Sequence, residues 1–125
     1  MARIRTVKPE FWRHNVMARE EDFTQLLAIA LLNYADDHGY FMADPALIRG
    51  DVFPFRDDLA NISRSLARLS EVLYIEVRNH PERGAIGRIT TWEAHQRVDH
   101  PKASKIKELF DLAKSSRNPR ETLAP

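Results

Sequence analysis

Four polar residues in the segment 57–73 could together bind nucleic acid. They occupy positions i, i+3, i+4 and i+7 of one helical face: Asn61, Arg64, Ser65 and Arg68. Arginine can donate two hydrogen bonds to guanine, asparagine can pair with adenine, and serine can bond to a base edge or a phosphate. The spacing therefore predicts a helix surface that reads DNA bases, although the same residue types also occur on a helix face that is merely solvated.

The opposite side of the same segment is apolar. Its residues recur at spacings of three and four: Leu59, Ile62, Leu66, Leu69 and Leu73. A helix that starts near Asp57 or Asp58 would bury this stripe and expose the polar one. The prediction depends on free guanidinium groups. It would be contradicted if Arg64 and Arg68 were paired with neighbouring carboxylates or covered by another chain.

The preceding residues predict two more helices and a strand. Apolar residues at helical spacing indicate a helix over about residues 22–37, which Gly39 ends. An extended piece follows at 40–42. Asp44 and Pro45 then have the types expected at the start of a short helix that must stop before Pro54.

Two alternating runs after the third helix predict a β-hairpin. LYIEVRN and AIGRITTW each alternate apolar and polar residues, and the turn residues HPERG separate them. The loop is expected at about residues 79–84. Arg78, Arg83 and Arg88 lie on or near this hairpin, where they are expected to contact phosphates rather than to read sequence.

This order of elements predicts an α+β, mainly helical fold: a winged helix-turn-helix with a three-helix core, a β-hairpin wing and an extra C-terminal helix. A two-stranded hairpin is too small to stand alone and must lean on the helices. The C-terminal helix either closes the domain's own core or pairs with its twin in a homodimer. The expected divisions are a basic arm (1–19), the winged-helix domain (20–101), the C-terminal helix (102–114) and a disordered tail (115–125).

Charge is unevenly distributed along the 125 residues. The net charge is +4 over 1–19, −7 over 20–58 and +4 over 59–125, so the total of +1 conceals two basic blocks. Such blocks could form a polyanion-binding face or merely solvate the surface. Further DNA contacts are expected from the arm, through Arg3, Arg5 and Lys8, unless the arm is only an unstructured terminus. The stretch after the hairpin is expected to add Gln96, Arg97, Lys102 and Lys105, unless it is only a connector.

Residues that could support catalysis or metal binding are sparse. The sequence contains no cysteine, no Gly-rich phosphate loop, no G-x-S-x-G and no H-E-x-x-H, so an enzyme and a cofactor are not expected. His95, Asp99 and His100 do not have the spacing of a metal site on one helix face. The aromatic rings of Phe11, Trp12 and Trp92 could stack on single-stranded bases but are expected to fill the core edge or to pin the N-terminal arm.

Parts of the sequence resemble a known family. The segments MARIRTVKPEFW, LLNYADDHGYF, DPALIRGDVFP and HQRVDHPKASKI are similar to small proteins encoded by bacteriophages and prophages. That family consists of winged-helix DNA-binding proteins, often described as phage replication or replisome-organiser-like proteins. The resemblance covers about residues 1–107 and implies a winged helix and a phage origin.

The resulting hypothesis is sequence-specific binding of double-stranded DNA in the initiation of replication. Two alternatives remain: a phage transcriptional repressor or activator, and a winged-helix module that binds a host factor. The expected partners are DNA, a second copy of the chain, and a host or phage replication protein. The longest apolar stretch is too short to span a bilayer. The expected location is the bacterial host cytoplasm, in association with the nucleoid.

Overall fold

The fold follows from a computed structural model that describes residues 3–115. Its larger elements are three helices and a hairpin, with a short strand between the first two helices. In chain order they are α2 (Asp22–Tyr34), β1 (Tyr40–Met42), α3 (Pro45–Val52), α4 (Leu59–Glu71), β2 (Ile75–His80) and β3 (Gly84–Ile89). The helices, the strand and the hairpin predicted from the sequence are all present, and the class is α+β.

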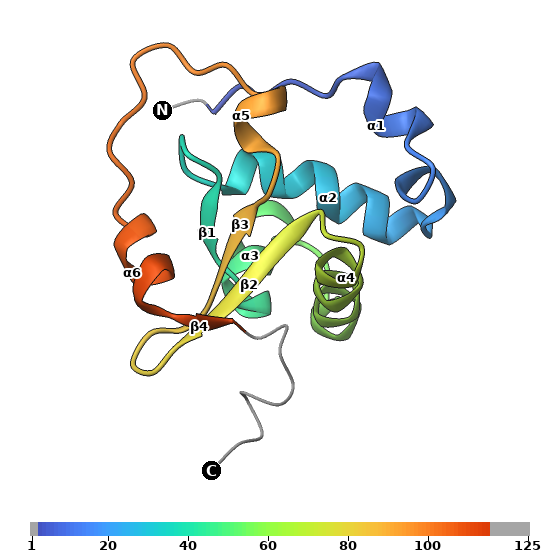
Figure 1. Cartoon of the computed structure of the whole chain (residues 1–125). Coiled ribbons are helices and arrows are strands. Elements are labelled where there is room, and N and C mark those ends of the chain that lie inside the picture. Colours follow the sequence, from blue (N-terminus) through green and yellow to red (C-terminus); the bar gives the residue numbers. More distant parts are fainter. Residues whose placement is uncertain (1–2, 116–125) are drawn as a thin grey trace.

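Short elements surround this core (Figure 1). The N-terminal segment forms α1 (Pro9–Arg13) and a 3-10 turn, η1 (Met17–Arg19), whose Met17 is buried. Helix α5 (Trp92–His95) follows the hairpin, and α6 (Lys107–Leu112) leads into β4 (Lys114–Ser115). The predicted C-terminal helix over 102–114 is therefore shorter than expected. Ser115, assigned to a disordered tail, pairs with Arg78 in the sheet; residues 116–125 lie outside the described part of the chain.

The strands form one antiparallel sheet in the order β1-β3-β2-β4. In the register of the three longer strands, Phe41 lies opposite Gly87, and Gly87 lies opposite Val77. Gly87 lets the Phe41 ring lie directly against the backbone of β3, because a Cβ at this position would collide with the ring. Side chains alternate between the two faces of a sheet, so this register decides which residues face which layer.

One face of the sheet packs against helices α2, α3 and α4. Phe41, Ile75 and Ile89 join the main hydrophobic cluster on this face. The helices bury their apolar stripes there, with Leu27, Leu31, Ile48, Ile62 and Leu69 each less than 1% exposed. The inward stripe predicted for α4 is thus confirmed at Ile62, Leu66 and Leu69, whereas Leu59 and Leu73 remain partly exposed at its ends.

The other face of the sheet is covered by α6. Phe110 of α6 packs with Tyr40 and Ile86 in a second buried cluster. The C-terminal helix was expected either to close the domain's own core or to pair with its twin in a homodimer. The contacts of Phe110 support the first role. Arg78 and Arg88 belong to the same face, because each pairs across the sheet with a residue of this cluster.

Candidate nucleic-acid interface

Three of the four polar residues predicted on α4 are accessible. Side-chain exposure is 54% for Arg64 and 46% for Arg68, and Asn61 lies beside Arg64. Ser65 is different. It is fully buried, and its hydroxyl lies 3.0 Å from that of Thr24 on α2. The prediction that Ser65 contacts DNA is therefore wrong, because this small residue lies where the two helices pack together.

Both α4 arginines are paired with carboxylates. The guanidinium of Arg68 donates to both carboxylate oxygens of Glu20 at 2.8–3.0 Å and lies 3.6 Å from Glu71. Arg64 bonds to Glu21 and to the Asn61 side-chain oxygen. The Arg68 hydrogen bond lowers the pKa of Glu20, against the opposing effect of burial, and the same bond raises the pKa of Arg68.

This pairing contradicts the prediction of free guanidinium groups on α4. The two arginines lie among three carboxylates, so the local charge is −1 rather than +2. The exposed Arg64–Glu21 pair is weak, about 0.2–1 kcal/mol. The Arg68–Glu20 pair is firmer, because the Glu20 carboxylate is only 8% exposed and accepts from two nitrogens of Arg68. The carboxylates stay in place when a pair opens, however, and they would repel a phosphate backbone. In this conformation α4 does not offer a basic surface.

The N-terminal arm is built into the fold. Arg3 donates to the carbonyl oxygens of Tyr34 and Ala35, and Lys8 donates to that of Ala94. Arg5 is only 4% exposed. It donates to the carbonyl oxygen of Leu32 and to Asp37, and its guanidinium lies 4.9 Å from the Trp92 ring. Cationic groups at a helix C-terminus donate hydrogen bonds to its unpaired carbonyl oxygens and interact favourably with the negative end of the helix dipole. Arg3 and Arg5 therefore cap α2 instead of extending into solvent.

Two of the three hairpin arginines are also engaged within the molecule. Arg78 pairs with Glu76 and lies 4.1 Å from the Phe110 ring, and Arg88 pairs with Glu93 and lies 5.3 Å from the Tyr40 ring. Both are held on the face that α6 covers. Arg83, in the turn between β2 and β3, is exposed and forms no ion pair within residues 3–115.

The stretch between α5 and α6 is a strap (residues 96–106) tied to the domain at several points. Gln96 exchanges two hydrogen bonds with the backbone of Thr6, at 2.9 and 2.7 Å. The backbone N–H of Lys102 donates to Asp37 at 3.0 Å, and its carbonyl oxygen lies 3.0 Å from the His38 ring nitrogen. Ser104 bonds to Asp36. The segment Asp36–His38 is thus the main anchor of the strap.

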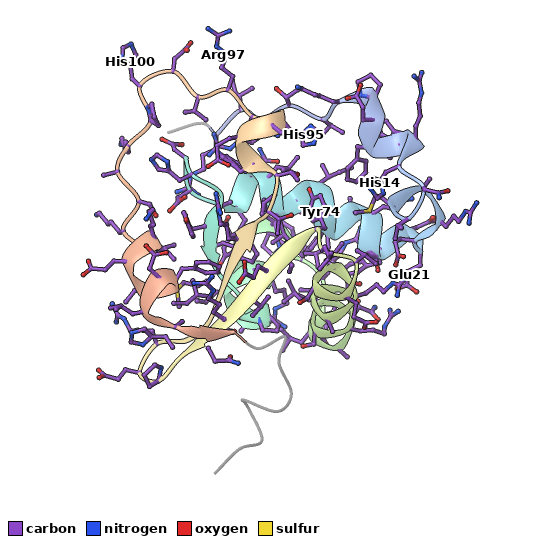
Figure 2. All side chains as sticks on the ribbon, in the orientation of Figure 1. His14, Glu21, Tyr74, His95, Arg97 and His100 are labelled. Atoms are coloured by element: carbon purple, nitrogen blue, oxygen red, sulfur yellow. The ribbon has the colours of Figure 1, made fainter. Side chains whose placement is uncertain are left out.

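The strap presents cations that have no carboxylate partner. Arg97, Lys102 and Lys105 are exposed, and in the part of the chain that the structure describes their side chains form no ion pair. Against Asp99, the only acid of the strap, they give a net charge of +2. The strap and α6 form the left edge of the view in Figure 1, with the hairpin turn below them, and Figure 2 shows Arg97 and His100 pointing outward.

The sequence did not indicate how these residues are held. Asp36 and Asp37 lie at the end of the helix expected over about residues 22–37, and Glu20 and Glu21 lie just before its start. Their long-range partners, the strap and the α4 arginines, are more than 40 residues away along the chain. The clustering of acids at both ends of α2 was the one available signal.

The other candidate features are the histidines that could bind a metal and the aromatic rings that could stack on bases. His95, Asp99 and His100 are exposed, and no group of three or more His, Asp or Glu within residues 3–115 is arranged to hold a metal ion. Trp92 is buried and Phe11 packs against the core, as expected, whereas Trp12 is 53% exposed. None of the described helices has the length and apolar character needed to cross a bilayer.

Comparison with known proteins does not assign the chain to a class. No protein-family model, no curated protein and no solved structure matches it.

Proposed function

We propose that this chain is a winged-helix protein that binds double-stranded DNA, with phosphate contacts supplied by the strap and the neighbouring hairpin turn. The observation that carries the proposal is the set of exposed cations without carboxylate partners on the strap: Arg97, Lys102 and Lys105. The order of helices and hairpin supports the winged-helix assignment, with the hairpin as the wing.

The way the strap is held favours binding to a polyanion. Asp36, Asp37 and His38 fix its backbone, so its lysines need less ordering on association than those of a loose tail. A row of cations on an extended segment can follow a phosphate backbone, and Arg83 on the hairpin turn adds a further cation at the same edge of the molecule. These contacts position the protein without specifying sequence.

Sequence specificity, in this proposal, is a second step. Arg64 would have to exchange Glu21 for a base edge, and the small energy of this exposed ion pair makes that exchange accessible. Arg68 is not available in the same way, because two of its nitrogens bind the Glu20 carboxylate, which is only 8% exposed. The proposed role in replication initiation rests on the sequence resemblance alone, since no family model, curated protein or solved structure matches the chain. A binding site that overlaps promoters would instead make the protein a transcriptional regulator.

Affinity for duplex DNA is expected to depend strongly on salt. Each phosphate contact releases counterions, so three or four cations predict that log K falls with log salt concentration with a slope of about −3 to −4. Fluorescence anisotropy of a labelled random-sequence duplex, titrated at several salt concentrations, measures this slope. Binding that is absent at low salt, or insensitive to salt, would contradict the proposal.

A further inference from the structure

An apolar pocket lies at the end of the molecule opposite the hairpin turn. Its volume is about 260 Å³, and it is enclosed by α1, α5 and the chain that connects α4 to β2. Figure 2 labels three of its lining residues, of which Tyr74 lies nearer the centre of the molecule than His14 and His95. Most of its lining is apolar, from Val7, Phe11, Val72, Leu73, Tyr74 and Trp92. Cavities of about 150 Å³ already accept a benzene ring, so this pocket has room for an aromatic side chain.

The mouth of the pocket is apolar and conformationally unusual. Leu73 has a φ of +68°, a left-handed conformation that glycine normally supplies at the end of a helix. The N–H of Tyr74 donates to the carbonyl of Leu69 at 3.0 Å, which closes the end of α4 around it. The Leu73 side chain is 51% exposed, and Val7 and Val16 are 37% and 38% exposed. The left-handed backbone that ends α4 thus places the exposed Leu73 side chain at the mouth of the pocket.

A complementary side chain lies elsewhere on the same chain. Phe55, in the turn between α3 and α4, is 99% exposed. It cannot reach its own pocket, because α4 separates the two. The turn precedes the first residue of α4, Leu73 follows the last, and a helix of 13 residues is about 20 Å long. A Phe55 that fills the pocket must therefore come from another molecule.

The charges around the two features are of opposite sign. The turn carries Asp57 and Asp58 against Arg56, a net charge of −1, and the fully exposed Asp57 side chain also lies 3.5 Å from Arg49 of α3. Lys8 lies at the pocket, and Arg13 and Arg97 lie on α1 and just after α5 beside it, against Glu10 and Glu93. Two histidines, His14 and His95, also line the pocket. This complementarity favours an acidic turn over a basic or neutral partner.

We propose that the pocket binds Phe55 of a second copy of this chain, so that copies associate head to tail. The interface is heterologous: each molecule offers a pocket on one side and a phenylalanine on the other, and association continues into a ring or an open chain. The inference does not depend on DNA binding.

Sedimentation velocity over a range of protein concentrations tests the proposal. The wild-type chain is expected to form species larger than a dimer. Phe55→Ser removes the inserted side chain, and Leu73→Asp places a charge at the mouth in a residue type that tolerates the left-handed conformation. Each variant alone is expected to associate about tenfold or more weakly, as for a central aromatic anchor. Mixed together, the two variants retain one functional pocket and one Phe55, so they are expected to form dimers that grow no further.

Leu112→Ser is the matched control, because Leu112 is also an exposed apolar residue, at 68%, but lies on α6. It should associate like the wild type, and unchanged thermal unfolding of all variants shows that they fold. A wild-type chain that stays monomeric, or a Phe55→Ser variant that associates normally, would overturn the proposal. So would a Phe55→Ser variant that lost only DNA affinity, since Phe55 would then be a DNA-contacting residue.

Discussion

Replacing Arg5 by methionine is expected to lower the free energy of unfolding by about 2–3 kcal/mol. Methionine keeps much of the aliphatic length but removes every hydrogen bond of the guanidinium. The carbonyl of Leu32 and the carboxylate of Asp37 each lose a donor, and the contact with Trp92 is lost. A marginally stable domain of this size would register such a change clearly.

Urea unfolding followed by circular dichroism measures the effect. Arg13→Met is the control, since Arg13 is exposed and forms no ion pair within residues 3–115; it should change stability by less than about 0.5 kcal/mol. Equal stability of the Arg5 and Arg13 variants would show that the arm is not part of the folded core.

Replacing Asp37 by alanine is expected to cost about 2–4 kcal/mol, because it leaves the buried Arg5 without its counter-charge and removes the acceptor of the Lys102 backbone. It should also loosen the strap. Hydrogen exchange would show faster exchange at the Lys102 amide. Asp99→Ala, on the strap itself but without a partner in the described residues, should leave both stability and exchange unchanged.

The same residue predicts a pH dependence of stability. The hydrogen bond from the Lys102 backbone, followed by that from Arg5, lowers the pKa of Asp37 from its ordinary value of 3.8. A carboxyl with a lowered folded pKa stabilises the protein above its unfolded pKa, and this contribution is lost as pH falls through the folded value. The stability difference between wild type and Asp37→Ala should therefore be constant near neutral pH and shrink as the pH falls below the ordinary pKa of 3.8. A difference that stays constant in acid as well would show that the charge on Asp37 is irrelevant.

The regular elements could be predicted because their causes are local. The inward stripe of α4 follows from leucine and isoleucine spacing, and α3 begins where Asp44 caps the Ala46 N–H and Pro45 occupies the first turn. The hairpin follows from alternation and a polar turn. Each of these signals lies within a few residues of the structure that it produces.

The site could be predicted only in part, because its partners are distant in sequence. Nothing near Arg64 or Arg68 indicates that Glu21 and Glu20, more than 40 residues earlier, would neutralise them. Ser65 has helical spacing on the polar side, yet a small residue at a helix crossing is buried by the close approach of α2. The strap cations, by contrast, were among the predicted DNA contacts, and their side chains form no hydrogen bond or ion pair within the described residues.

The most direct test of the proposed function compares two sets of variants on the same duplex. The first changes Arg97, Lys102 and Lys105 to glutamine, and the second changes Arg64 and Arg68 to glutamine. The strap set is expected to lower DNA affinity at least about tenfold at low salt and to reduce the salt slope by about three units, whereas the α4 set should retain the wild-type slope. Loss of affinity in the α4 set, with an unchanged strap set, would contradict the assignment of the phosphate contacts to the strap.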